Sequence, residues 1–337
     1  MYEHWSDSIT VGFDYTVGFI SFVANLILIY IILKYTPEST KTYASIILAI
    51  TISDCLSFCG TFMTSVRVLP RRDKLIYIFR GLCKYCFKDD LEFRAKFCLI
   101  WYAQHTQFYI LNHIILIFSY VYRMLIITNP LKQIDRRTLV YSILLLYCPL
   151  HFCYFNWAAY MALQPMELVS KEIAKFEPDI VYSNATYYAI INLSDPSQIV
   201  FHILSVSSAS VAILVTLLCR WRVIAFTRKY QQSEALKKLH NSLELVFSCQ
   251  AIGPLMSSIA SLLYMLVEFG SSGGTMILLE NLIGKPSVIM YIVNPIVTVI
   301  FITPYKMVVL RWFRSVFAIY PDAPVLIDLS RSATGTS

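Results

Sequence analysis

Long apolar stretches constrain this chain more than any other feature. A helical span of the bilayer needs about 20 apolar residues, and its backbone must satisfy its own hydrogen bonds because lipid offers none. Seven such stretches fit in the 337 residues, of which only 15% are charged, too few to cover a soluble core of that size. We therefore predict an all-α membrane protein, a seven-transmembrane helix bundle, with spans at Tyr15–Leu33, Tyr43–Met63, Cys98–Met124, Leu139–Leu163, Ile199–Leu218, Leu243–Phe269 and Pro286–Thr303.

The spans divide the chain into four parts. Residues 1–14 are predicted to form an extracellular N-terminus, 15–305 the helical domain, and 321–337 a disordered tail. In residues 306–320 the apolar side chains share one helix face and basic residues lie among them, which is typical of a helix on a membrane surface. The apolar piece Met276–Ile283 either extends the seventh span or forms a short helix of its own.

The distribution of Lys and Arg predicts the orientation. Segments on the N-terminal side hold 12 basic residues and those on the other side hold 16, but nine of the 12 lie in the single loop Arg67–Lys96. Without that loop the counts are 3 and 16, which by the positive-inside rule places the N-terminus outside and the C-terminus in the cytosol. The predicted outer loop Gln164–Ser197 also carries two candidate glycosylation sites, Asn184 and Asn192.

Three cysteines lie on the predicted outer side. Cys83, Cys86 and Cys98 fall in the loop Arg67–Lys96 or just after it, in a compartment where disulfides persist. The other outer loop, Gln164–Ser197, contains no cysteine, so a local bridge is expected. We favour Cys83–Cys98, and Cys86–Cys98 stays open because connectivity does not follow from sequence.

The third span carries a polar stripe at helical spacing. Its members recur three, four or seven residues apart and so share one face: His105, Tyr109, Asn112, Ser119 and Arg123. Its outer half, with His113 beside it, is predicted to line a ligand cavity together with the fifth, sixth and seventh spans. The alternative is hydrogen bonding between helices, which is the commoner role for a single histidine. The candidate ligand-binding residues are His105, Tyr109, Asn112, His113, His202, Tyr264 and Tyr291.

Two further features inside the spans have two interpretations each. Asp54 lies midway along the second span, where a carboxylate costs at least ~2.5–3.5 kcal/mol and therefore needs a partner or a role. It is either a hydration or ion site that biases helix packing or a carboxylate that simply hydrogen-bonds to its neighbours. Pro254 in the sixth span either kinks a helix that swings as a lever or makes a fixed kink for packing.

Several short motifs occur in a fixed order along the chain. They are Asn25 in the first span, Ser53-Asp54 in the second, Tyr122-Arg123 at the base of the third, Gln250-Ala-Ile-Gly-Pro254 in the sixth, and Asn294-Pro295 followed by Pro304-Tyr305-Lys306. Together they resemble the nematode serpentine chemoreceptors, seven-helix G-protein-coupled receptors, of the delta class or a close sister class. The likeness covers about residues 15–310. Lys306 stands where the family has arginine, and Lys88–Lys96 looks like a charged insertion.

The resemblance implies a function and its partners. It implies chemosensation at the plasma membrane of sensory neurons, including their cilia, a small-molecule ligand, signalling through a heterotrimeric G protein, and contact with membrane lipid. Neither a cofactor nor nucleic acid is expected. With the family in view, the candidate switch and coupling residues are Asp54, Tyr122, Arg123, Gln250, Pro254, Asn294, Pro295 and Tyr305.

A small secondary transporter and a ligand-gated channel subunit are the alternatives to a receptor. A transporter is expected to show inverted repeats and paired interior charges, whereas this sequence shows no repeat and one mid-membrane carboxylate. A channel needs a polar pore lining, which the stripe of the third span could imitate. No His-x-x-x-His pair and no paired carboxylates lie in the spans, so we expect neither an enzyme nor a metal site. The ligand, the G-protein subtype and the oligomeric state stay open.

Overall fold

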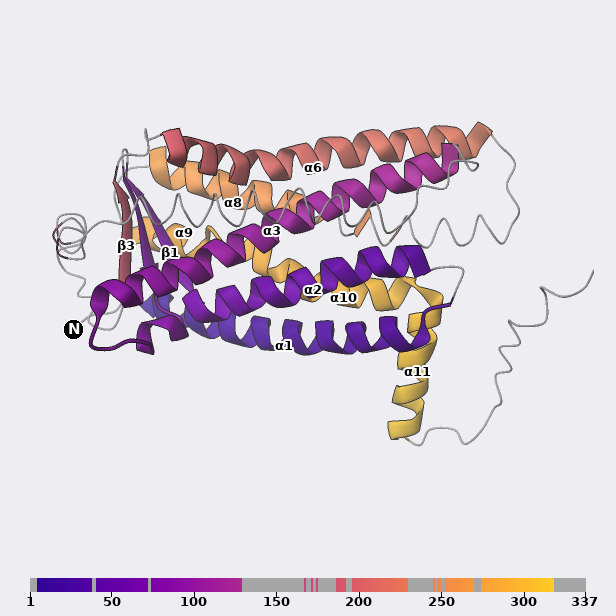
Figure 1. The fold of residues 1–337 in the computed structure, drawn as a ribbon, viewed down its shortest axis with the longest axis horizontal. Helices are drawn as coiled ribbons and strands as arrows, with labels where there is room; N and C mark the ends of the chain where they lie inside the picture. Colours follow the sequence, from indigo (N-terminus) through magenta and orange to yellow (C-terminus); the bar gives the residue numbers. More distant parts are fainter. Residues whose placement is uncertain are drawn as a thin grey trace, which may run out of the picture.

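The fold is a bundle of long helices with a small sheet at one end. A computed structural model describes residues 5–37, 41–71, 74–128, 186–191, 196–229, 252–269 and 274–317, with a few single positions between 167 and 249. Its helices are α1 (Trp5–Tyr35), α2 (Lys41–Thr64), α3 (Leu91–Thr128), α6 (Pro196–Lys229), α8 (Ile252–Phe269), α9 (Gly274–Leu282), α10 (Lys285–Phe301) and α11 (Thr303–Phe317) (Figure 1).

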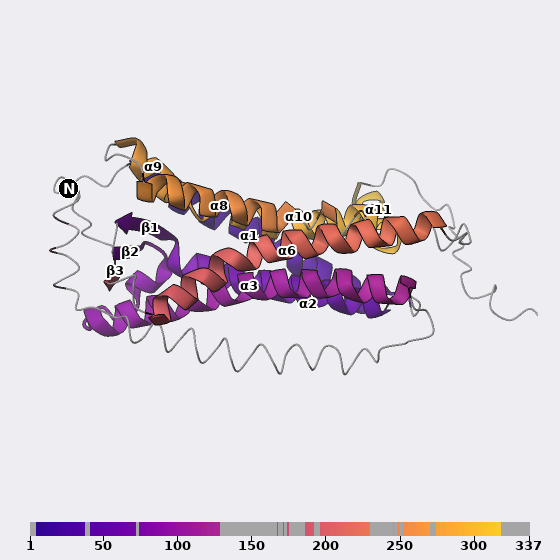
Figure 2. The ribbon, with the colours of Figure 1, turned by 90° about the horizontal axis from the view of Figure 1, so that it is seen from above.

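The long helices run side by side along one axis (Figures 1 and 2). α2 and α6 both pack on α3, α1 packs on α2 and α10, and α8 packs on α6 and α10. Large apolar side chains point outward, among them Phe19 (65% exposed), Leu214 (58%) and Leu262 (56%), whereas many polar side chains are buried inside. Apolar residues outside and polar residues inside are what a bundle in lipid requires.

The helices agree with the predicted spans where both are described. α1, α2, α3, α6, α8 and α10 overlap six of them, and the fourth, Leu139–Leu163, lies outside the described residues. On length and apolar composition alone, α1 and parts of α2 and α6 pass as spans among the residues described. α1 already begins at Trp5, ahead of the expected Tyr15, and the apolar piece 276–283 forms most of α9, separate from α10.

A three-stranded sheet is the feature that an all-helical prediction missed. β1 (Val66–Arg71), β2 (Lys74–Phe79) and β3 (Thr186–Ile191) pair antiparallel in the order β1-β2-β3. Their β-branched and aromatic residues are a strand signal, but we read the loop that holds β1 and β2 for its basic charge and its cysteines. We call the end of the bundle that carries the sheet the sheet end.

The sheet packs on a cluster of apolar side chains at this end. Buried members are Val68, Leu75, Tyr77, Phe79, Leu99, Val267 and Ile283. The short 3-10 helix η2 (Leu82–Tyr85) follows β2, and a disulfide joins Cys83 to Cys98, whose Cα atoms are 5.3 Å apart. Cys86 is a free thiol, so the structure contains the favoured one of the two pairings.

At the opposite end the chain turns sharply out of α10. α10 and α11 meet at an angle of 94°, so α11 lies across the bundle axis (Figure 1). Buried Tyr305 hydrogen-bonds to the Thr36 hydroxyl at 2.8 Å and packs with Leu28, Ile31 and Ile47. These contacts fix the start of α11 against α1 and α2. The expected tail, residues 321–337, lies outside the described part.

Candidate functional site

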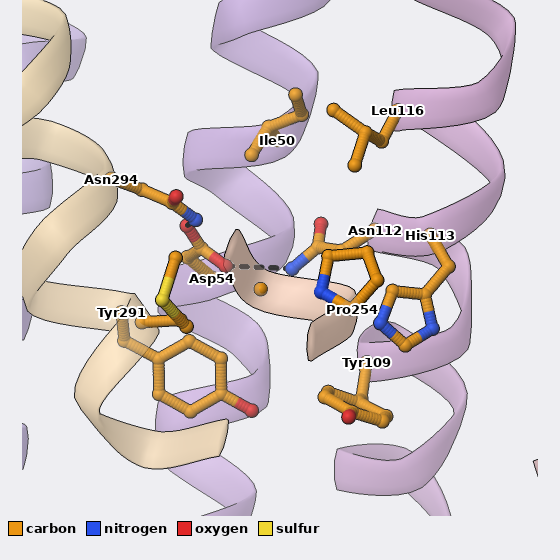
Figure 3. A pocket seen from close by; sticks show the side chains of 11 residues that line it. Ile50, Asp54, Tyr109, Asn112, His113, Leu116, Pro254, Tyr291 and Asn294 are labelled. Atoms are coloured by element: carbon orange, nitrogen blue, oxygen red, sulfur yellow. Dashed lines mark hydrogen bonds between the residues drawn. The ribbon is translucent and has the colours of Figure 1, made fainter. Parts of the chain in front are cut away.

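A small cavity lies in the middle of the bundle among α2, α3, α8 and α10. Its volume is about 40 Å³, and its polar lining comes from three helices (Figure 3). The lining residues that matter for its chemistry are Asp54 of α2, Tyr109, Asn112 and His113 of α3, and Tyr291 and Asn294 of α10. At ~10–15 Å³ of such volume for each water molecule, this space among the described residues corresponds to about three waters.

Asp54 is the centre of this site. Its side chain is 1% exposed, and it accepts hydrogen bonds from Asn112 Nδ2 at 2.6 Å and from Asn294 Nδ2 at 2.9 Å. One carboxylate thus ties α2 to α3 and α10. Both asparagines keep a buried Oδ1 atom without a hydrogen-bond partner in the described part of the chain. The site therefore offers acceptor oxygens to an occupant that can donate hydrogen bonds.

His113 joins three helices beside the cavity. Its Nδ1 lies 3.3 Å from the Ser208 hydroxyl of α6, and its Nε2 lies 3.3 Å from the Ser257 hydroxyl of α8. The Tyr109 ring packs edge-on against it, with 4.6 Å between ring centroids. Ser257 in turn donates to the Gly253 carbonyl at 3.0 Å, next to Pro254. His113 therefore connects α3 to α6 and α8 at the cavity wall, which Pro254 also lines.

His105 lies outside the cavity lining. Its Nδ1 is 3.0 Å from the Ser57 hydroxyl and 3.2 Å from the Thr61 hydroxyl, both on α2. Ser57 also hydrogen-bonds to the Tyr291 hydroxyl at 2.5 Å. For His105 the structure thus gives the contacts of the alternative interpretation, a histidine that bridges helices.

The other candidate residues are dispersed. Tyr264 packs against the apolar cluster under the sheet, away from the cavity, and Tyr122 is buried with Ile46 and Ile50 of α2. His202 and Arg123 lie on α6 and α3, with side chains outside the described set. Three candidates lie outside the described residues altogether: Asn184, Asn192 and Gln250.

The two predicted prolines, Pro254 and Pro295, lie on α8 and α10. Pro254 lines the cavity near the first described residue of α8, so the part of the sixth span that would precede a kink is not described. Pro295 is buried inside α10, one residue after Asn294.

The sequence analysis missed Ser208 and Ser257, the partners of His113. Serine is common in apolar spans, and no spacing distinguishes these two.

Comparison with known proteins gives a consistent result. The family model for serpentine type 7TM GPCR chemoreceptors Srd matches residues 11–311. Serpentine receptor class delta-1 of Caenorhabditis elegans is 24% identical over 302 residues, which are 86% of this chain and 76% of the relative. Class delta-19 of the same organism is 25% identical over 87% of this chain and 84% of its own. Class delta-2 is 28% identical over 84% of this chain and 77% of its own.

A solved structure shares the fold. The crystal structure of squid rhodopsin superposes with a TM-score of 0.64 and covers 96% of this chain and 85% of its own. The two sequences are 14% identical, so this likeness concerns the fold alone. It agrees with a helix bundle of the rhodopsin kind.

Proposed function

This chain belongs to the Srd family of serpentine seven-transmembrane chemoreceptors, and from that membership we propose that it binds a small molecule in the bundle and signals to a cytosolic heterotrimeric G protein. The family is one of membrane receptors and not of enzymes. A transporter or channel gains no specific support, since the described residues show one carboxylate in the middle of the bundle.

The observation that carries the proposal is the hydrogen-bonded junction at Asp54. Three helices meet there through Asn112 and Asn294, next to a cavity whose two asparagine Oδ1 atoms accept no hydrogen bond from any described residue. A ligand shifts a receptor only by its differential affinity for two packings. A molecule that enters this junction has to enlarge the cavity and so separate the helices, which gives it that differential affinity.

The opposite end supports the coupling part of the proposal. Tyr122-Arg123 lies near the end of α3, and α11 presents exposed Lys306, Arg311 and Arg314. Basic side chains on a helix that crosses the bundle axis suit anionic lipid headgroups and a cytosolic partner. We place this end in the cytosol and the sheet end outside, at the plasma membrane and the sensory cilium.

A response assay tests the ligand part. Cells that express the receptor with a promiscuous G protein are screened with volatile and small polar compounds, and a dose-dependent signal is expected. Tyr109→Ala should then raise the half-maximal concentration about tenfold, or ~1.4 kcal/mol, at equal surface expression. Ile100→Ala is the matched control, because Ile100 is 50% exposed on the same helix. Uptake of a compound without any G-protein signal would instead identify a transporter.

The same assay tests the coupling part. Arg123→Ala should cut the maximal response while agonist binding is kept, because the change lies far along α3 from the cavity. Pro254→Ala should lower the maximal response by removing the kink predicted for the sixth span, and Ile259→Ala, at a position 42% exposed on α8, serves as its control. A normal maximum in both variants would reduce Arg123 and Pro254 to packing residues.

A further inference from the structure

Six charged side chains are buried together at the sheet end. Each is at most 7% exposed, and three are acidic and three basic: Asp7, Asp14, Arg67, Arg80, Glu280 and Lys285. We call them the charge cluster. Buried charges persist only when each is paired, and here the formal charges balance. Nothing in the ligand site uses them, so their role needs an account of its own.

The first arm of the charge cluster ties the sheet to α1 and α9. Arg67 of β1 donates to Glu280 of α9 from Nε at 3.0 Å and from Nη2 at 2.5 Å. Arg80, just after β2, donates to Asp7 of α1 at 2.5 Å. Asn281 of α9 donates to the same Asp7 oxygen at 2.8 Å.

The second arm ties α10 to α1 and α2. Lys285, the first residue of α10, donates to Asp14 Oδ2 at 2.5 Å, and the Ser65 hydroxyl donates to the same oxygen at 2.8 Å. Ser65 connects α2 to β1 with φ at 34°, a left-handed conformation that is uncommon outside glycine. The turn from helix to sheet is thus bonded directly to the carboxylate.

The sheet lies at this end of the bundle and shares its apolar cluster (Figure 1). Side chains of β2 lie in the apolar cluster with residues of α3 and α8, and the Tyr77 ring is 4.8 Å from Tyr102 between centroids. Phe79 and Leu75 are also buried there, at 0% and 1% exposure. We call the sheet, which is packed into this end of the bundle, the sheet plug.

The geometry points to a latch: the charge cluster holds the sheet plug in the end of the bundle, and its release opens the sheet end. Apolar contacts alone allow gradual sliding, but a buried ion pair is either made or broken, because an unpaired charge must reach water. Loss of one pair therefore favours opening of the whole plug. The role of the latch in controlling ligand entry rests on the proposed function. Closure of the sheet end does not depend on that function and can be measured without a ligand.

Thiol labelling of the purified receptor in detergent measures closure without a ligand. The background is Cys86→Ser, which keeps the Cys83–Cys98 disulfide. The reporter is Val68→Cys in the plug, where Val68 is 8% exposed, and the control is Ala44→Cys at the opposite end, where Ala44 is 5% exposed. Labelling of the background without either reporter is subtracted.

Lys285→Met leaves Asp14 buried without its cation. It should raise the labelling rate of the Val68→Cys reporter by about tenfold or more and leave the Ala44→Cys rate within about twofold. The double change Asp14→Asn with Lys285→Met removes both charges and should return the rate close to the starting value. Equal rates in all variants, or equal increases at both reporters, would overturn the latch, the second by showing a general loss of stability.

A milder variant covers the case in which Lys285→Met does not fold. Ser65→Ala removes one hydrogen bond to Asp14 and should raise the Val68→Cys rate about threefold, again without change at Ala44→Cys. Absence of any rise with Ser65→Ala would count against the latch. Because no ligand is used, a failed latch and a failed receptor assignment are separate results.

Discussion

Tyr291 of α10 hydrogen-bonds to two other helices, α1 and α2. Its hydroxyl bonds to Ser57 of α2, and its carbonyl accepts from Asn25 of α1 at 2.9 Å. It is 2% exposed and also lines the cavity. At the scale of single residues, then, the site is built from side chains that serve both packing and the cavity wall, and the two roles need separate measurement.

Tyr291→Phe should separate them. It removes only the hydroxyl, so the free energy of unfolding should fall by about 1–2 kcal/mol because Ser57 loses a buried partner. Tyr109→Phe is the control, since the Tyr109 hydroxyl makes no hydrogen bond with any described residue, and its effect should stay within ~0.5 kcal/mol. Thermal unfolding in detergent checks both, and equal losses would contradict the assignment.

At the scale of elements, the helices could be predicted, whereas the pairing of the strands into a sheet could not. Apolar length is a local property, so each described span follows from its own residues. Pairing in a sheet is not local: Phe79 of β2 lies opposite Thr186 of β3, which the chain reaches only after α3 and a long further segment. No local pattern in Thr186–Ile191 identifies that partner.

The candidate site was predictable to the same limited degree. The spacing of the stripe placed His105 and Asn112 on one face of α3, and both do contact α2. Spacing does not say what the facing helix offers at each level. Hydroxyls of Ser57 and Thr61 fill the space at His105, whereas at Asn112 a cavity remains.

The disulfide allows a test of one element junction. Cys83→Ser with Cys98→Ser frees η2 from the first turns of α3, and the free energy of unfolding should fall by about 2–5 kcal/mol. Cys86→Ser changes a free thiol at the residue directly after η2 and should have almost no effect on the free energy of unfolding. Melting curves under non-reducing conditions make the comparison, and an equally large loss with Cys86→Ser would show that the bridge is not what holds this junction.

At the scale of the whole molecule, the two ends of the bundle axis differ in structure and charge. The sheet, the disulfide and the charge cluster lie at one end, and α11 with its basic side chains lies at the other (Figure 1). The two ends therefore differ in chemistry as the two sides of a membrane do. The orientation proposed above follows this difference and the 3 to 16 count of basic residues outside the loop Arg67–Lys96.

Glycosidase treatment tests that orientation. Asn184 and Asn192 flank β3 in sequence, so with the sheet end outside the receptor should carry glycans. Glycosidase treatment should then remove these glycans and shift the receptor to faster migration on a gel. Asn184→Gln with Asn192→Gln should abolish the shift. A C-terminal tag should stay unlabelled on intact cells, and labelling of that tag would invert the orientation and remove the basis for cytosolic coupling.

The charge cluster also implies a delay during biosynthesis between a buried charge and its partner. Asp14 in the first helix has its cation, Lys285, 271 positions later in the chain. At about 5–20 residues synthesised per second, that partner arrives on the order of 15–50 s after the first span has left the ribosome. Throughout this interval the nascent chain carries an uncompensated carboxylate in its first helix. A premature stop before Lys285 would make that condition permanent, so truncated chains should be recognised and degraded as unfinished.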